Sequence, residues 1–512
     1  MNRMHLIAAA VAAMTAAGAA HALTPAEIAT ARSAGTLKHV RVTGASALRL
    51  SVAAYAKEIC DATTMHVYFQ GSNAQGTGYR AYACNLGQAV GNYAAGTPLL
   101  LTKRDTGGST QGITPIARQD ATQTHILVDA TCVVEAGNPG PVGNAGDPAV
   151  ANYVCPSTEQ AKGDAGLSDV EPALLQATVN LPTGQTALTA AELGTLDVGP
   201  VVQALFGVVV NTKAYRALQE AQGIIAPGGA MIDVPADQST WTAATLATIP
   251  SLPATFVRAA FTGGLLGGVP NSAPSNQRGW NIVIPTTVDA NVVTKTLNIC
   301  RRTEGSGTQT SSNAFFANNP CAPNAGTLYN PLGVAGSSGN ETTTNATVTA
   351  APIVVQEGTS AGQVENCVGA DANAAADGDG VAYAIGYLGR ESNPKRSGGD
   401  LGFRYVKLDG VAPQREIAKA GNYPIVYEAT MQWNKSYVTP GSDKESFLKA
   451  IRSGFGSANA LAVLDSDTQQ GVMTPPTSYA GSYASQVGNT ALFGSRVARI
   501  SGNSCAALRV IK

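Results

Sequence analysis

The stretch "CRRTEGSGTQTSSNAFF", residues 300–316, combines the residue types that bind a small oxyanion. Two arginines supply positive charge, and the planar guanidinium group of arginine can bind two oxygens of one anion. The glycines allow a tight turn, and the serine and threonine beside them supply hydroxyl groups and a helix N-cap. A helix that begins here would point its free N–H groups and positive dipole end at the anion. The candidate ligands are Arg302, Ser306, Gly307 and Thr308, with Glu304 expected to orient the guanidinium group.

Three other segments show the same order of a strand, a polar turn and a helix. The first is "HVRVTGASALRLSVAAYAKEIC", where Ala45 and Ser46 occupy the turn and Ser46 is the expected N-cap. The second is "PLLLTKRDTGGSTQGITPIAR", with Ser109 in the turn and a helix that Pro115 disturbs. The third is "AGLSDVEPALL", in which Asp169 is expected at a helix start. If the four turns converge, they form one anion pocket.

Asp169 gives this pocket a means of selection. A carboxylate repels a fully deprotonated anion, but it can accept a hydrogen bond from a ligand that carries a proton. Hydrogen phosphate carries such a proton at neutral pH, and sulfate does not. Each turn taken alone has a simpler interpretation, because serine and aspartate before a helix are common caps. Arg302 beside Glu304 can likewise be an ordinary surface ion pair.

The first 22 residues have the layout of a secretory signal peptide, with Arg3 near the start, an Ala-rich apolar run and the triplet Ala20-His21-Ala22. Cleavage is expected after Ala22. The apolar run is too short to span a membrane, and no later stretch is long and apolar enough. We therefore expect a protein that is exported to the periplasm or secreted, without membrane insertion.

The eight cysteines are expected to form disulfides in an oxidising compartment. Four bridges allow on the order of a hundred connectivities, and neighbouring pairs such as Cys132–Cys155 and Cys300–Cys321 are the simplest hypotheses. The full set is Cys60, Cys84, Cys132, Cys155, Cys300, Cys321, Cys367 and Cys505.

Charge and histidine content argue against several classes of protein. Lysine and arginine total 33 and aspartate and glutamate 34, so the chain lacks the basic surface of a nucleic-acid-binding protein. After the signal segment only His39, His66 and His125 remain, and their spacing does not suit a metal site. We assign no catalytic residue, no metal and no cofactor. The acidic stretch "DANAAADGDG" lacks the ligand spacing of a calcium-binding EF-hand and is interpreted as a solvated loop.

Strands alternate with helices along the rest of the chain, which is typical of α/β architecture. "VVQALFGVVVNTKAYRALQ" is interpreted as a buried strand followed by a helix, and "NYPIVYEATMQWNK" as another strand. "FRYVKLDGVAP" predicts a hairpin with Asp409-Gly410 as its turn. "WNIVIP" is expected to be a strand, and "TALFGSRVARI" in the tail a helix. The Gly/Ser/Thr/Asn-rich stretch 324–352 is interpreted as an inserted loop.

Several of these segments resemble the periplasmic phosphate-binding proteins of ABC transporters. "VTGASA", "GLSDVEP" and above all "RRTEGSGT" before a helix carry the resemblance, and "GDGVAYAIGYLG" is similar to that family's return-crossover segment. The resemblance implies a type II periplasmic-binding-protein-like fold, with two lobes, each a mixed sheet flanked by helices, that close over phosphate. It also implies an ABC permease as partner. By resemblance, the contact residues are Ala45, Ser46, Ser109, Asp169, Arg302, Ser306, Gly307 and Thr308.

This sequence departs from the family at two points of the site. Glu304 stands where the family usually has an aspartate, and Ser72 in "YFQGSNAQGTGYRAY" is an alternative to Ser109. Ser109 is preferred because Gly-Gly-Ser-Thr leads directly into a helix-like segment.

The lobes are expected to be discontinuous, with residues 38–205 and 390–512 in lobe 1 and 206–389 in lobe 2. Two other functions remain open. One is an extracellular structural or adhesive protein that reuses the fold. The other is a secreted phosphatase, against which the scarcity of histidine counts.

Overall fold

The computed structural model describes twelve segments of the chain. These are residues 23–70, 78–135, 151–265, 279–322, 329–331, 342–344, 353–369, 381–395, 399–466, 470–476, 493–499 and 503–510. The expected signal segment, the alternative Ser72, the acidic stretch 371–380 and most of the expected inserted loop lie outside them.

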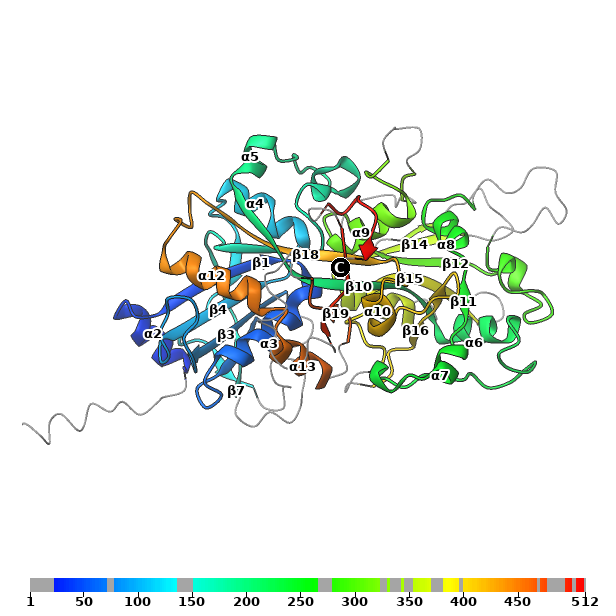
Figure 1. Cartoon of the computed structure of the whole chain (residues 1–512), viewed down its shortest axis with the longest axis horizontal. Coiled ribbons are helices and arrows are strands. Elements are labelled where there is room, and N and C mark those ends of the chain that lie inside the picture. Colours follow the sequence, from blue (N-terminus) through cyan, green and yellow to red (C-terminus); the bar gives the residue numbers. More distant parts are fainter. Residues whose placement is uncertain are drawn as a thin grey trace, which may run out of the picture.

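Two long antiparallel strands, β10 (Leu196–Asn211) and β18 (Val426–Asn434), run from one half of the molecule into the other (Figure 1). The first part of β10 pairs with β18, and its last part, Phe206 to Val210, pairs with β15 (Tyr383–Gly389). A single sheet path therefore passes through both halves. The strand order is β13-β14-β12-β15-β10-β18-β9-β1-β4-β3-β2-β7-β6.

The first half contains a mixed sheet with helices on both faces (Figure 1). One face packs against three helices and the other carries the N-terminal helix α2. The strands are β1 (Lys38–Gly44), β2 (His66–Gln70), β3 (Tyr79–Asn85), β4 (Pro98–Arg104), β6 (Val133–Val134), β7 (Ala151–Cys155) and β9 (Ala165–Ser168). The helices are α2 (Pro25–Ser33), α3 (Arg49–Ile59), α12 (Asp443–Gly454) and α13 (Ala458–Ser466).

The second half repeats this arrangement around the other part of β10. Helix α10 packs on one face of its sheet, and α6, α8 and α9 contribute to the core on the other. The strands are β12 (Leu297–Arg302), β13 (Thr342–Thr344), β14 (Ile353–Gly358), β15 and β16 (Phe403–Tyr405). The helices are α6 (Thr212–Ala221), α7 (Ala243–Ala247), α8 (Ala254–Phe261), α9 (Gly307–Phe316) and α10 (Ala361–Gly369). This two-part α/β architecture is the fold class expected from the sequence.

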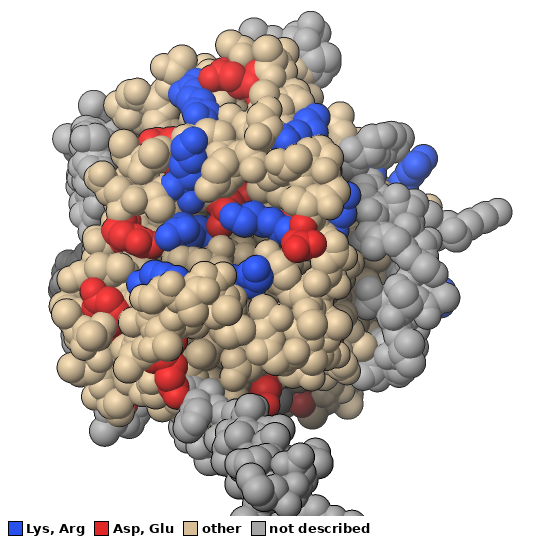
Figure 2. Space-filling view, turned by 90° about the vertical axis from the view of Figure 1, so that its left-hand side faces the viewer, with Lys and Arg blue, Asp and Glu red and all other residues tan. Residues whose placement is uncertain are grey.

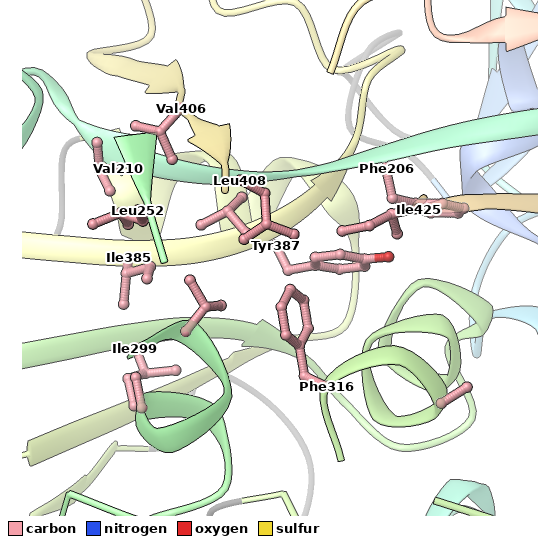
Figure 3. Close-up of a cluster of buried hydrophobic side chains, with 14 of the residues drawn as sticks. Phe206, Val210, Leu252, Ile299, Phe316, Ile385, Tyr387, Val406, Leu408 and Ile425 are labelled. Carbon is pink, nitrogen blue, oxygen red and sulfur yellow. The ribbon is translucent and has the colours of Figure 1, made fainter. Parts of the chain in front are cut away.

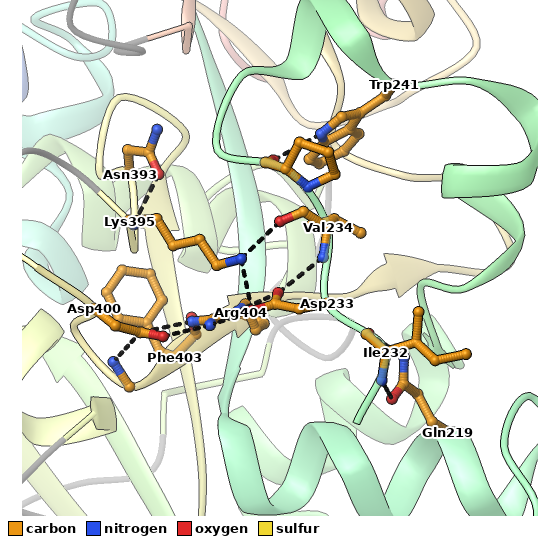
Figure 4. Close-up of polar contacts among 12 residues, drawn as sticks. Gln219, Ile232, Asp233, Val234, Trp241, Asn393, Lys395, Asp400, Phe403 and Arg404 are labelled. Atoms are coloured by element: carbon orange, nitrogen blue, oxygen red, sulfur yellow. Dashed lines mark hydrogen bonds and ion pairs between the residues drawn. The ribbon is translucent and has the colours of Figure 1, made fainter. Parts of the chain in front are cut away.

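The chain passes back from the second half to the first along β18, which begins at Val426. The sequence predicted this change of lobe at residue 390. β16 pairs with the end of β10, and β17 (Lys407–Leu408) pairs with β11 (Ser251–Leu252). Arg404 also binds Asp233 of the second half, with Nε and Nη2 each 2.7 Å from a carboxylate oxygen (Figure 4). Residues 403–408 therefore lie with the second half, whereas Arg415 pairs with Asp465 of helix α13 in the first half.

A large apolar core fills most of the second half, extends to Ile116 and Val170 of the first half, and fixes helix α9 (Figure 3). Phe206 of β10 stacks on Tyr387 of β15, with ring centroids 5.6 Å apart. Phe316, the last residue of α9, meets Tyr387 edge-on at 6.0 Å. All three side chains are buried, and burying an aromatic side chain stabilises a fold by roughly 2 kcal/mol. The end of α9 is thus anchored in the core, and its beginning is free to face the first half.

Most elements expected from hydrophobic periodicity are present. β10 and α6 occupy "VVQALFGVVVNTKAYRALQ", and β18 occupies "NYPIVYEATMQWNK". Asp409 and Gly410 have positive φ of 48° and 83° and form the expected turn, closed by the bridge between Leu408 and Val411.

Three expected elements are wrong. "WNIVIP" forms a short 3-10 turn, η6 (Trp280–Ile282), in place of a strand. "AGLSDVEPALL" forms β9 and a short 3-10 turn, η3 (Leu174–Gln176), without the expected helix at Asp169. The described part of "TALFGSRVARI" leads into β20 (Val497–Ala498), which pairs with β21 (Arg509–Val510). In that segment Phe493 and Val497 are buried four residues apart, a spacing that a helix would also give.

Four disulfides use all eight cysteines. The expected pair Cys132–Cys155 is confirmed, and the expected pair Cys300–Cys321 is wrong. Cys300 of β12 faces α10 and bonds to Cys367, while Cys321 follows α9 and bonds to Cys505. The remaining bridge is Cys60–Cys84.

The surface carries charges of both signs. On the end of the first half, lysine and arginine side chains are interspersed with aspartate and glutamate (Figure 2). Two ion pairs of this half, Arg41–Glu159 and Lys444–Asp164, have N–O distances of 2.7 and 2.6 Å. Within the described segments, the structure contains no helix of the length and apolarity needed to cross a membrane.

Candidate functional site

Arg302 ends strand β12 and lies at the boundary between the two halves, with only 2% of its surface exposed. Nη1 donates to Oγ of Ser46 in the first half at 3.1 Å. Nε donates to the carbonyl oxygen of Gly358 at 3.1 Å, and Nη2 to that of Thr359 at 2.8 Å. Burial lowers the pKa of Arg302 to about 10, while the negative charge of Asp169 acts in the opposite direction. The guanidinium group stays charged at neutral pH and is held in one orientation.

The orientation of Arg302 comes from the end of β14, and Glu304 takes no part in it. The chain leaves β12 after Arg302 and turns at Gly305, which has a φ of +82°, so that Glu304 is exposed. There Oε2 of Glu304 accepts a hydrogen bond of 3.4 Å from Thr183. The role expected for Glu304 is therefore filled by the two carbonyl groups of Gly358 and Thr359.

Ser306 begins helix α9 as the sequence predicts. Its backbone is extended and its Oγ accepts a hydrogen bond from the N–H of Gln309 at 3.4 Å. Thr308 lies in the first turn, where its Oγ1 donates to Oδ2 of Asp169 at 3.3 Å. The first turn of α9 thus lies directly against Asp169, which belongs to the loop after β9.

Ser109 joins three of the four turns. Its Oγ accepts the N–H of Gly307 and the N–H of Asp169, both at 3.2 Å. A second hydrogen bond joins the turn at Ser109 to the turn before α9, since the N–H of Thr110 donates to the carbonyl oxygen of Gly305 at 3.0 Å. Gly307 has to be glycine here, since a Cβ would lie 2.6 Å from both Ser109 Oγ and Asp169 Cβ. Ser109 starts the short helix η2 (Ser109–Gly112), and α4 (Thr114–Arg118) follows with Pro115 in its first turn.

Asp169 is 1% exposed and carries one carboxylate oxygen, Oδ1, that accepts no hydrogen bond from a described residue. Burial raises its pKa above the usual value for aspartate. The charge of Arg302, the hydrogen bond from Thr308 and the charge of Lys103 oppose this rise. A buried oxygen without a donor is costly, so a ligand proton at this position would be stabilising.

Ser46 reaches the site by a different route from the one expected. Residues Ser46–Leu48 form a short 3-10 turn, η1, and the N-cap of α3 is Leu48, so Ser46 is not the cap. Its Oγ receives Arg302 instead. The N–H of Ala45 donates to the carbonyl oxygen of Leu167 at 3.0 Å and therefore already has an acceptor.

Two further ionisable residues belong to this environment and were missed from sequence. Lys103 is fully buried in β4, and its Nζ donates to the carbonyl oxygen of Gly44 at 2.6 Å and to Asp105 at 2.5 Å. Glu391, which follows β15, has a pKa raised to about 8, first by burial and then by the charges of Asp169 and Glu365. A lysine inside the apolar strand "PLLLTKR" is a signal that could have found the first.

The structure thus brings all eight expected contact residues to one boundary. It holds a buried guanidinium group, hydroxyl groups from both halves, the first turn of a helix and one acid. No group of three or more histidine, cysteine, aspartate or glutamate side chains within the described segments is placed to hold a metal ion. Together these features define an α/β protein with a buried cluster of polar and charged side chains at the boundary between its two halves.

No family model matches the sequence, and no curated protein matches it either. Several solved structures are similar to this chain. A phosphate ABC transporter substrate-binding protein from Clostridium perfringens with bound phosphate is 11% identical, with a TM-score of 0.38. The match covers 84% of this chain and 98% of that one.

Two others extend this picture. A DING protein is 12% identical with a TM-score of 0.37, and the match covers 91% of this chain and 97% of that one. An ABC-type phosphate transport receptor from Vibrio cholerae is 10% identical with a TM-score of 0.32, covering 81% and 94%.

Proposed function

We propose that this chain is a solute-binding protein that captures phosphate or a related tetrahedral oxyanion between its two halves. The observation that carries the proposal is the position of Arg302. A buried guanidinium group has lost most of its hydration, and it lies where hydroxyl groups of both halves and the first turn of α9 meet. An oxyanion at this point would regain charge-assisted hydrogen bonds for Arg302 and would face the positive end of the α9 dipole.

The groups that would bind the ligand already form hydrogen bonds with one another, so the ligand would replace these bonds with bonds to itself. Arg302 Nη1 and Ser46 Oγ are 3.1 Å apart, so an anion between them would replace this direct bond with one bond to each. Ser109 and Thr308 would offer their hydroxyl groups in the same way. Binding therefore requires the two halves to separate, and closing over the anion would supply part of the affinity.

Asp169 supports phosphate over sulfate as the ligand. Its free Oδ1 can accept a proton that hydrogen phosphate carries at neutral pH and sulfate lacks. Replacing that donor with a bare oxygen would leave two negatively charged oxygens facing each other in a buried place.

The rest of the proposal concerns where the protein acts. The first 22 residues and the four disulfides support export to the periplasm or beyond. In the periplasm, an ABC permease would be the partner that receives the anion from the closed form.

The test is a calorimetric titration of the mature protein with phosphate, sulfate and arsenate between pH 6 and pH 8. We expect heat with phosphate and arsenate and none with sulfate. No heat with any of the three would overturn the proposal and favour an extracellular structural role. Steady release of phosphate from a chromogenic ester, lost in Asp169→Asn, would identify a phosphatase instead.

A further inference from the structure

The C-terminal residues 503–506 contact both halves beside the anion site. Cys505 forms the disulfide with Cys321, which lies five residues after the last residue of α9. The preceding residue, Ser504, binds Glu171 twice. Its N–H donates to Glu171 Oε1 at 2.9 Å, and its Oγ accepts the N–H of Glu171 at 3.4 Å. Adjacent residues of the tail thus hold the second half covalently and the first half by hydrogen bonds.

The two anchor points lie close to the residues that face each other across the site. Glu171 is two residues after Asp169, in the same loop that follows β9. Cys321 continues from α9, whose first turn binds Asp169 through Thr308. The loop after β9 and the segment that contains α9 are therefore connected at two places. Asp169 and Thr308 bond directly to each other, and residues 504 and 505 connect Glu171 to Cys321.

Val497 and Arg499, which precede residues 503–506 in the chain, bond to the strands that connect the two halves. Arg499 Nη2 donates to the carbonyl oxygen of Val426 at 2.8 Å, and the N–H of Arg499 donates to Glu428 Oε1 at 3.1 Å. Gln203 of β10 donates to the carbonyl oxygen of Val497 at 2.7 Å.

Cys505 differs from the cysteines of the other bridges because it is exposed. The six cysteines of the other three disulfides are at most 7% exposed. Cys505 is exposed to solvent, and Cys321 is partly exposed. A small thiol can reach this disulfide while the fold is intact, since access limits the rate of exchange.

We propose that residues 503–506, which we name the strap, hold the two halves in the closed arrangement and that the Cys321–Cys505 disulfide controls their opening. With the disulfide intact, the strap raises the effective concentration of the Asp169 loop at the start of α9. A dithiol that supplies two electrons and two protons converts the bridge to two cysteine thiols and becomes a disulfide itself. The halves then open more often. The link to anion exchange rests on the proposed function, but the opening itself does not.

The experiment compares Cys321→Ser/Cys505→Ser with the matched control Cys132→Ser/Cys155→Ser, whose bridge lies in the outer sheet of the first half. The first readout is hydrogen exchange of the amides of Thr110 and Gly307, which bond across the boundary to Gly305 and Ser109. We expect exchange at least about tenfold faster in the strap variant only. Equal protection in both variants would overturn the proposal.

The second readout is the dissociation rate of phosphate, measured with the same proteins. It should rise about tenfold in the strap variant and stay unchanged in the control. If the parent protein binds no phosphate, the proposed function fails while hydrogen exchange still tests the strap. If the strap variant does not fold, mild native reduction of the parent protein replaces it, with mass spectrometry to count free thiols. Faster exchange that reoxidation reverses supports the strap, and exchange that reduction leaves unchanged overturns it.

Discussion

Arg302 and Ser46 are 256 residues apart in the sequence, and Nη1 of Arg302 donates to Oγ of Ser46 at 3.1 Å. One belongs to the end of β12 in the second half and the other to the turn after β1 in the first. Their bond is direct evidence that the two strand ends face each other.

Replacement of Arg302 by lysine should weaken phosphate binding at least about tenfold, because an ammonium group cannot keep three planar bonds and also bind two oxygens. Calorimetry measures the change. Arg301→Lys is the matched control, since Arg301 pairs with Glu357 and not with Ser46. Equal affinities for Arg302→Lys and the parent protein would remove Arg302 from the site.

Asp169→Asn should reduce the difference between the affinities of the protein for phosphate and for sulfate. An asparagine amide no longer repels sulfate, so sulfate binding should become measurable while phosphate binding falls about tenfold. Competition between the two anions at pH 7 measures the ratio. If the variant keeps the selectivity of the parent protein, Asp169 does not select the ligand by accepting a hydrogen bond from its proton.

Gly307→Ala should destabilise the contact between the halves, because the new Cβ would lie 2.6 Å from Ser109 Oγ and Asp169 Cβ. Overpacking of this kind costs roughly 1–3 kcal/mol. Thermal unfolding measures the loss, and the closed form should also be less protected in hydrogen exchange. Gly194→Ala is the control, as no atom lies within 4 Å of its Cβ position. A melting temperature equal to that of the control would contradict the close packing.

The raised pKa of Glu391 predicts how the free energy of unfolding depends on pH. Its folded pKa of about 8 lies above the value of an unfolded glutamate, so its contribution is fully present below about pH 4.5 and is lost as the pH rises through 8. Glu391→Gln should therefore be more stable than the parent protein at pH 8.5, by roughly 4 kcal/mol, and within about 1 kcal/mol of it at pH 5. Denaturant unfolding at the two pH values measures this. A stability difference that does not change with pH would contradict the raised pKa.

The parts of the site that could be predicted are those set by local sequence. A serine that follows a glycine turn and precedes an amphipathic run caps a helix, and Ser306 does so. The strand ends at Arg302, Ser109 and Asp169 were recognisable from apolar runs that stop at a polar turn. The convergence of Ser109 and Asp169 follows from the parallel pairing of β1 with β4 and β9, whereas Arg302 belongs to β12 and pairs with β14.

The parts that could not be predicted depend on contacts between distant segments. The partners of Arg302 are carbonyl groups at the end of β14, and nothing in the local sequence around Arg302 specifies that pairing. Glu304 was the obvious local candidate, and the turn at Gly305 directs it to the surface. The disulfides of Cys300 and Cys321 have the same character, since each joins elements that only the folded sheet brings together.

The position of β18 determines the order in which a growing chain can assemble this protein. β18 lies between β9 and β10, although residues 426–434 are synthesised long after both of those strands. The bridges Cys60–Cys84 and Cys132–Cys155 can close as soon as the first half has emerged, but its sheet has a gap until the strand that fills it arrives. Cys321–Cys505, which spans 184 residues, can form only after all the other cysteines have been synthesised, because Cys505 is the last of the eight in the sequence. A chain that stops before residue 426 would therefore expose the unpaired edges of β9 and β10 to neighbouring chains.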